Sequence, residues 1–227
     1  MSLGTGWAPP SLATQTGPLL WVVPLVGTGL ACLSAEELVW GEGLPAAQRR
    51  RYWHSRAALR GVLAPVLGCS PTAVPLCSPP GRPPRLLEGL GWISLSHSGE
   101  GLMIGFSNEP IGVDLELVSR PLDAAALMGR FYPIGEQGQL EGLSGEALRL
   151  AVLTSWVLKE AAIKWRRSSL AGELRSWSYD HSSGQLRHLG DGLQPECCTA
   201  MAAGWRWAAV GPGCSCPRTE IQILTPD

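Results

Sequence analysis

A carboxylate and an ammonium group stand one helical turn apart in the segment 156–164, which reads W-V-L-K-E-A-A-I-K. Trp156, Glu160 and Lys164 are each four residues apart, so they share one stripe if this segment is the second half of a long helix. Lys159 and Lys164 are the only lysines among the 18 Lys and Arg residues. Such a pair suggests a need for compact point charges. Taken alone, an ordinary Glu–Lys pair on a solvated face is the better interpretation.

A second pair of acids lies on the segment 111–118, where aliphatic residues alternate with Gly112, Asp114 and Glu116. The period of two predicts a strand, so Asp114 and Glu116 share one face about 7 Å apart. Two carboxylates placed this way repel each other, and a bound cation removes the conflict. The strand therefore favours a metal site over two solvated acids on an edge strand.

Basic residues gather on a predicted helix over residues 45–67, where five arginines occur in twelve residues without an acid. Guanidinium groups suit phosphate, so the face could be an anion cradle. A solvated basic face explains the segment equally well. The five are Arg49, Arg50, Arg51, Arg56 and Arg60.

Several further elements must position these residues. We expect a strand over 19–26, a capping box at 34–37 that opens a short helix, a surface loop over 68–91 and a three-strand meander over 92–118. Ser144 should cap the long helix, and strands are expected near 177, over 203–210 and over 221–224.

This order predicts an α+β fold in which two similar α/β halves pack as a pseudo-dimer, each with a small, mainly antiparallel sheet and a long helix. The predicted division is a flexible arm over 1–18, an N-terminal half over 19–110 and a C-terminal half over 111–227, which carries most of the metal ligands.

Composition limits the classes of partner. A net charge of −1 over 227 residues gives no general attraction to nucleic acid or to an anionic membrane. The apolar run 19–25 is too short to span a bilayer and lacks basic residues before it, so we expect a cytoplasmic protein with reduced thiols. Cys197, Cys198, Cys214 and Cys216 lack the usual zinc spacing and are better explained as structural thiols.

Oxygen ligands from three carboxylates favour a hard cation, Mg²⁺ or Mn²⁺. Mg²⁺ in proteins usually keeps waters and binds substrate phosphate oxygens. Cationic side chains near such a site therefore indicate a polyanionic, phosphate-bearing substrate.

Three segments match a known family in order and separation: S-L-S-H-S at 94–98, G-V-D-L-E at 112–116, and W-V-L-K-E-A-A-I-K at 156–164. With them the chain resembles the Sfp-type 4′-phosphopantetheinyl transferases, in outline over 19–210. The resemblance implies an Mg²⁺-dependent enzyme that moves the phosphopantetheine arm of coenzyme A onto a serine of an acyl or peptidyl carrier protein. The by-product would be adenosine 3′,5′-bisphosphate.

The resemblance also implies roles at the metal. Asp114, Glu116 and Glu160 would be the magnesium ligands. Glu160, directly or through a metal-bound water, would be the base for the carrier serine, and Lys164 would stabilise charge on the pyrophosphate.

Other residues would hold the rest of coenzyme A. His97, with Ser96 beside it, would contact the 3′-phosphate, although His97 could also be a structural histidine. Arg82 stands where the family usually has the lysine of G-K-P. Arg51 is the preferred helix arginine for a phosphate contact, with Arg49, Arg50 and Arg56 as alternatives.

Two other functions share this residue set: a metal-dependent pyrophosphohydrolase and a non-catalytic coenzyme A-binding module. Carrier proteins are usually acidic, so a basic docking patch is expected, with Arg120, Arg130, Arg166 and Arg167 as candidates, although scattered surface charge is the better interpretation of each. The resemblance implies a monomer.

Overall fold

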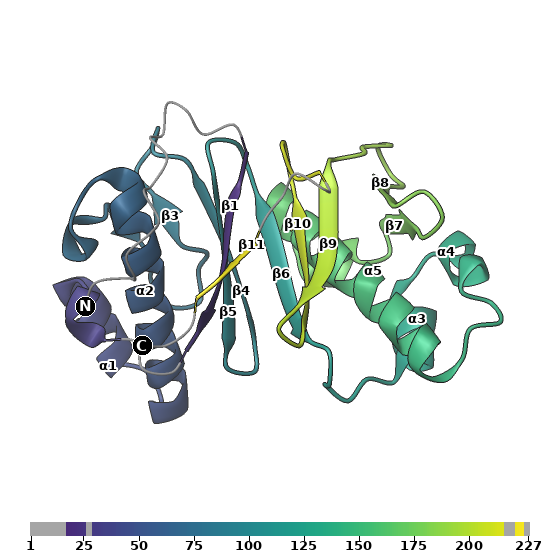
Figure 1. The fold of residues 1–227 in the computed structure, drawn as a ribbon, viewed down its shortest axis with the longest axis horizontal. Helices are drawn as coiled ribbons and strands as arrows, with labels where there is room; N and C mark the ends of the chain where they lie inside the picture. Colours follow the sequence, from purple (N-terminus) through teal and green to yellow (C-terminus); the bar gives the residue numbers. More distant parts are fainter. Residues whose placement is uncertain (1–16, 26–28, 216–220, 225–227) are drawn as a thin grey trace. The chain divides into compact units, whose positions relative to one another are not determined.

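The computed structural model describes residues 17–25, 29–215 and 221–224, without the side chains of residues 170 and 171. Most of the predicted arm 1–18 lies outside them. The described residues divide into two compact units: a helical unit over Leu25–Leu90, and a sheet unit formed by Gly17–Pro24 with 91–224 (Figure 1). The predicted halves 19–110 and 111–227, and their pairing as a pseudo-dimer, stay predictions.

The helical unit contains α1 (Ala35–Glu42) and α2 (Ala46–Leu67), with short 3₁₀ turns η2 (Leu30–Cys32) and η3 (Pro71–Ala73). The predicted capping box is present, because the Ser34 side chain accepts from the Glu37 N–H while the Glu37 carboxylate accepts from the Ser34 N–H. Within the predicted loop 68–91, β2 (Leu76–Cys77) and β3 (Arg85–Leu86) pair as a small antiparallel hairpin.

The sheet unit holds a four-stranded sheet in the order β11-β1-β5-β4. Its strands pair antiparallel except β1 with β11, which run parallel. The strands are β1 (Leu19–Pro24), β4 (Trp92–Ser98), β5 (Gly101–Ser107) and β11 (Ile221–Ile223).

A second, antiparallel sheet has the order β6-β10-β9, and β7 pairs with β8 in a separate hairpin. These strands are β6 (Gly112–Leu117), β7 (Trp177–Asp180), β8 (Gln185–His188), β9 (Cys197–Ala202) and β10 (Trp205–Val210). The accompanying helices are α3 (Ala124–Phe131), α4 (Ile134–Gln139), α5 (Gly145–Arg166) and α6 (Leu170–Glu173). The predicted α+β class with small antiparallel sheets is confirmed.

The predicted meander over 92–118 is wrong in one respect. β4 and β5 form a hairpin, but β6 leaves their sheet and pairs with β10. Period-two alternation fixes the faces of a strand and not its partner, and the turn at 108–110 carries the chain to the other sheet. Serine side chains of β4 still reach β6: Ser94 Oγ accepts from the Val113 N–H, and Ser98 Oγ from the Leu117 N–H.

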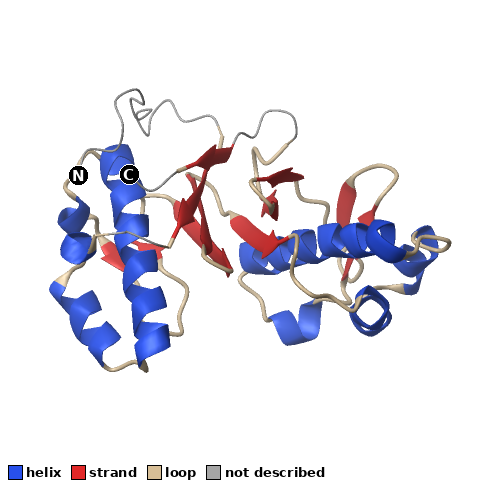
Figure 2. Cartoon of the chain, turned by 60° about the horizontal axis from the view of Figure 1, so that its bottom comes forward, coloured by secondary structure: helices blue, strands red, loops and turns tan. Residues whose placement is uncertain are grey.

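Two apolar layers fix the position of β6. Val113 and Leu115 pack with Leu20 and Met103 of the first sheet. On the other face of the second sheet, Ala208 and Val210 of β10 pack against residues of α5 such as Ala161. Figure 2 shows α5 as the long helix running alongside these strands. The face of β6 that carries Gly112, Asp114 and Glu116 therefore looks toward α5.

None of the helices in the described part of the chain is both long and apolar enough to cross a membrane.

Candidate active site

Gly112 sets the distance between α5 and β6. A Cβ atom built at this position would overlap the Ala161 carbonyl oxygen and the Trp165 backbone nitrogen. Only glycine, which has no Cβ, lets the helix backbone approach the strand this closely. Because Glu160 and Lys164 flank this contact on α5, and Asp114 lies two residues along β6, the close approach brings the acids of both elements together.

Asp114 is the centre of the cluster, and its side chain is only 3% exposed. Lys164 Nζ lies 2.6 Å from Asp114 Oδ1 and 3.1 Å from the carbonyl oxygen of Val113. Ser96 Oγ donates to the same Oδ1 at 2.7 Å. The other carboxylate oxygen, Oδ2, is buried without a hydrogen-bond partner. A buried, orphaned acceptor of this kind is costly unless something binds it.

Glu116 lies two residues further along β6 and is held from both sides. Ser98 Oγ donates to its Oε2 at 2.9 Å, and Arg120 Nη1 donates to its Oε1. Burial raises the pKa of Glu116, while the Ser98 hydrogen bond and the charge of Arg120 lower it. The charge of Asp114 raises this pKa further, as expected for neighbouring acids.

Glu160 completes the set from α5. Burial, and then the charge of Asp114, raise its pKa from 4.5 to about 7; Lys164 opposes this shift and Glu116 adds to it. The helix acid therefore senses both strand acids and Lys164, as the sequence predicted for a shared site. A carboxyl group whose pKa lies near neutrality is suited to accept and release a proton.

The raised pKa of Glu160 predicts a pH dependence of stability in the metal-free protein. Between pH 4.5 and about 7 the folded chain keeps a proton that the unfolded chain has lost, so stability falls as pH rises, by at most about 1.4 kcal/mol per pH unit, and levels off above pH 7. Urea unfolding in EDTA should show this slope, and Glu160→Gln should remove it. Equal slopes for the two proteins would contradict the shift.

The donor set fits a hard divalent cation, although the side chains are not gathered around one. Among the described residues, no three His, Cys, Asp or Glu side chains form a group that could hold a metal ion as they stand. Lys164 instead occupies one oxygen of Asp114. The orphaned Asp114 Oδ2 and the mutual repulsion of three acids are the features that a cation would relieve.

Lys159, the other lysine of the motif, has a structural role. Its Nζ lies 2.7 Å from Glu136 Oε2 of α4, with both side chains fully buried, and 3.7 Å from the centre of the Tyr132 ring. Burial lowers the pKa of Lys159 to about 8 against the charge of Glu136. Trp156 packs edge-on against the Phe131 ring.

Replacing Lys159 with Met should destabilise the protein by about 3–5 kcal/mol, because Glu136 would then be a buried charge without its counterion. The double variant Lys159→Met with Glu136→Met should recover most of this loss. Chemical denaturation of the three proteins measures both effects. A single variant as stable as the parent would show that the pair is not needed.

The five arginines of α2 differ in burial: Arg49 is half-buried and donates to the carbonyl oxygens of Glu42 and Leu44, and the other four form two groups. Arg56 and Arg60 are buried, so neither the anion-cradle interpretation nor the solvated-face interpretation holds for these two residues. Arg60 Nε donates to Glu37 Oε2 at 2.6 Å and its Nη1 donates to three carbonyl oxygens, while Arg56 donates to the Ser78 carbonyl. These contacts hold α1 against α2, and they also hold the loop that follows α2 against that helix.

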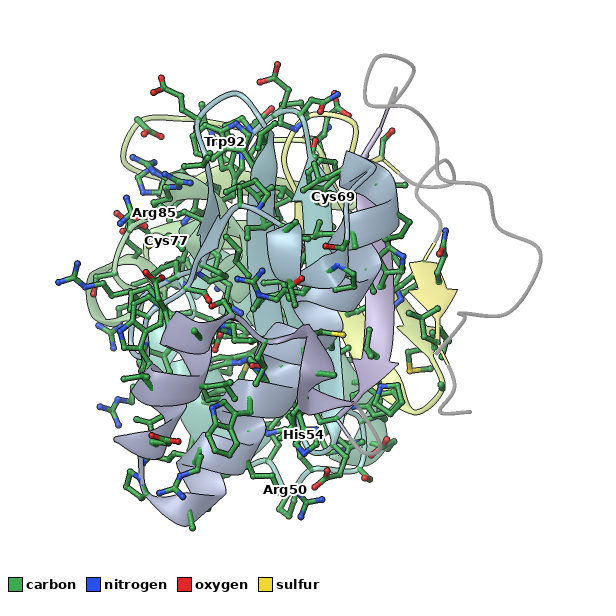
Figure 3. The ribbon with its side chains drawn as sticks, turned by 90° about the vertical axis from the view of Figure 1, so that its left-hand side faces the viewer. Arg50, His54, Cys69, Cys77, Arg85 and Trp92 are labelled. Carbon is green, nitrogen blue, oxygen red and sulfur yellow. The ribbon has the colours of Figure 1, made fainter. Side chains whose placement is uncertain are left out.

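Arg50 and Arg51 are exposed on α2, and Figure 3 shows Arg50 near His54 on this helix. Arg82 is exposed between β2 and β3 of the same unit. The phosphate contacts of Arg51 and Arg82 stay predictions.

The two predicted phosphate residues of β4 lie on opposite faces of the strand. Ser96 donates a hydrogen bond to Asp114, while His97 is half-buried and by strand alternation points to the other face.

Sequence reasoning missed the part played by Ser98 and Gly112. Ser94, Ser96 and Ser98 alternate along β4, and this period of two was the available signal that they share a face. What the sequence could not show was which strand that face would meet. Arg120, one of the candidates for a docking surface, is paired with Glu116, and its part in docking stays a prediction.

Comparison with known proteins supports the family that the sequence motifs resemble. Residues 110–208 match the family model of the 4′-phosphopantetheinyl transferase superfamily. The chain is 32% identical to a provisionally named 4′-phosphopantetheinyl transferase of Synechocystis sp. over 183 residues, which cover 77% of this chain and 74% of the relative. It is 28% identical to the 4′-phosphopantetheinyl transferase AcpT of Escherichia coli O157:H7, over 70% of this chain and 80% of the relative. The chain therefore belongs to the 4′-phosphopantetheinyl transferase superfamily and is a transferase.

Proposed function

We propose that this protein transfers the 4′-phosphopantetheine group of coenzyme A to a serine hydroxyl of an acyl or peptidyl carrier protein. The serine oxygen forms a new bond to the phosphorus nearer the pantetheine. The bond from that phosphorus to the bridging oxygen breaks, and adenosine 3′,5′-bisphosphate leaves. The observation that carries the proposal is the meeting of Glu160, Asp114 and Lys164 across the α5–β6 contact in a chain of this superfamily.

Glu160 is the residue best suited to take the serine proton. Without a bound cation, burial and the charge of Asp114 raise its pKa to about 7, which suits a carboxyl group that takes up and releases a proton. Lys164, which contacts Asp114, would stabilise negative charge on the leaving bisphosphate. Phosphoryl transfer depends mainly on such positioning and charge neutralisation.

Asp114, Glu116 and Glu160 would hold the divalent cation, Mg²⁺ or Mn²⁺. When bound, the cation would neutralise oxygens of the pyrophosphate. For this chain's own residues, that arrangement requires Lys164 to share or leave Asp114 Oδ1, and it gives the orphaned Oδ2 a partner.

The test is an intact-mass assay with coenzyme A, Mg²⁺ and a panel of apo-carrier proteins from fatty acid, polyketide and peptide pathways. We expect at least one carrier to gain the mass of one phosphopantetheine. Omission of Mg²⁺ or addition of EDTA should prevent the gain. A panel without any adduct, using folded protein, would count against the proposal.

The two alternatives make different predictions. A pyrophosphohydrolase would release phosphopantetheine into solution without a carrier. A non-catalytic coenzyme A-binding module would bind coenzyme A regardless of Mg²⁺, without product. The raised pKa of Glu160 supports proton transfer over simple binding.

The carrier is expected to be acidic, and its docking surface remains a prediction. Of the arginines considered for it, Arg166 is paired with Asp191 at 2.7 Å and Arg167 stacks over Trp92. Arg130 is exposed on α3. The monomeric state and the cytoplasmic location likewise stay predictions, as does the absence of nucleic acid and membrane partners.

A further inference from the structure

The two acids of β6 each have a basic side chain as a partner. Lys164 Nζ is 2.6 Å from Asp114 Oδ1, and Arg120 Nη1 contacts Glu116 Oε1. Both partners therefore occupy oxygens of residues proposed to bind the metal. A cation that uses these oxygens has to compete with Lys164 and Arg120. The role of Lys164 follows from the motif, whereas that of Arg120 does not.

Arg120 lies on the segment that follows β6, and its position is well defined by the backbone. The backbone N–H of Arg120 donates to the Leu117 carbonyl oxygen at 3.1 Å, which closes a turn. The next residue is Pro121, whose ring restricts the backbone at this point. Its side chain is 37% exposed, against 15% for Glu116. The guanidinium group therefore sits at the solvent side of the acids, where it can move without unfolding any element.

Arg120 affects more than its direct partner. Burial and Asp114 raise the pKa of Glu160, and the charges of Lys164 and Arg120 oppose that rise. The charge of Arg120 also lowers the pKa of Glu116. Arg120 thus lies within electrostatic reach of the helix acid as well as the strand acid. It belongs to the cluster rather than to a separate surface pair.

The charges of the cluster explain why such an arrangement is useful. When all three acids are ionised, the cluster with Lys164 and Arg120 has a net charge of −1. A divalent cation changes the net charge to +1, so a cluster that attracts cations becomes one that attracts phosphate. Arg120 is the more exposed partner of this partly buried pair, and ion pairs near the surface contribute little stability, so its contact with Glu116 can be exchanged at low cost.

We infer that Arg120 is a placeholder for the divalent cation: it holds Glu116 in the metal-free protein and turns to a phosphate oxygen of coenzyme A once the cation is bound. The inference rests on the proposed function. Ser98 Oγ keeps its hydrogen bond to Glu116 Oε2, so the carboxylate stays oriented when Arg120 leaves. The planar guanidinium group is suited to bind phosphate through two hydrogen bonds.

The first test is calorimetric titration of the metal-free protein with MnCl₂ alone. Arg120→Gln should bind Mn²⁺ roughly three- to fivefold more tightly than the parent, because the competing charge is gone. Arg120→Lys should stay near the parent. The matched control is Arg187→Gln, which removes an exposed charge from β8 and should leave the affinity unchanged. Circular dichroism should show that every variant is folded.

The second test is titration with coenzyme A in saturating Mn²⁺, without a carrier. Here Arg120→Gln should bind about tenfold more weakly, because it lacks a charge-assisted contact to phosphate. Arg120→Lys should fall between the two. Opposite signs in the two titrations are the signature of the exchange, since a purely structural role would weaken both. In turnover, the KM for coenzyme A should rise and the KM for the carrier should not.

The outcomes separate the inference from the function that it deepens. Parent protein that binds Mn²⁺ and transfers phosphopantetheine, with Arg120→Gln equal to Arg187→Gln in both titrations, would overturn the inference alone. A rise only in the KM for the carrier would overturn the phosphate contact and assign Arg120 to docking. Parent protein that fails to bind Mn²⁺ would overturn the metal site and the inference together.

Discussion

Replacing Glu160 with Gln is expected to reduce phosphopantetheine transfer by a factor of about 10²–10⁴, the usual contribution of a positioned general base. The amide keeps the size of the side chain but cannot accept the serine proton. The raised pKa of Glu160 and its electrostatic coupling to Asp114 are the reasons for this choice. Initial rates of holo-carrier formation, followed by intact mass, measure the effect.

Loss of activity alone would not separate catalysis from folding, so two controls accompany this variant. Glu141→Gln removes an exposed acid and should transfer at the parent rate. At pH 8, Glu160→Gln should unfold at a urea concentration no lower than the parent, because it removes a buried charge beside Asp114. A variant that is folded and retains full activity would refute Glu160 as the base.

Replacing Gly112 with Ala should disrupt the site by a different route. The added methyl group would meet backbone atoms of Ala161 and Trp165, which cannot move aside as a flexible side chain could. We expect a loss of about 3 kcal/mol or more in the free energy of unfolding. We also expect little residual transfer, because α5 would be pushed away from Asp114.

The matched control for Gly112→Ala is Gly138→Ala on α4, where a new Cβ would have no neighbour within 4 Å. That substitution should leave the protein unchanged or slightly more stable, because alanine favours the helix. Denaturant unfolding followed by tryptophan fluorescence compares the variants. If Gly112→Ala matched the parent in stability and activity, the close approach of α5 to β6 could not be what assembles the site.

The acidic and basic residues of the site could be predicted because both regular periods act locally. A spacing of four placed Glu160 and Lys164 on one stripe of α5, and a spacing of two placed Asp114 and Glu116 on one face of β6. Each inference concerns one element only. The motif resemblance supplied what periodicity could not, namely that the two elements face each other.

Relations between distant elements were the part that failed. The basic run on α2 could not reveal that Arg60 has a buried partner, since Glu37 lies 23 residues earlier. Lys159 was likewise grouped with the site by sequence, but it points to Glu136 on α4. The turn at 108–110 gave no sign that β6 would join β10 rather than β5. In each case the missing information was the partner across space.

The serine contacts between β4 and β6 also affect how the protein behaves at high concentration. The strand edges of two sheets meet here, and the hydroxyl groups of Ser94 and Ser98 accept two N–H groups of β6. An uncovered strand edge can recruit a strand from another molecule and start aggregation. By covering this edge, Ser94, together with Ser98, which also orients Glu116, should protect the folded chain from self-association.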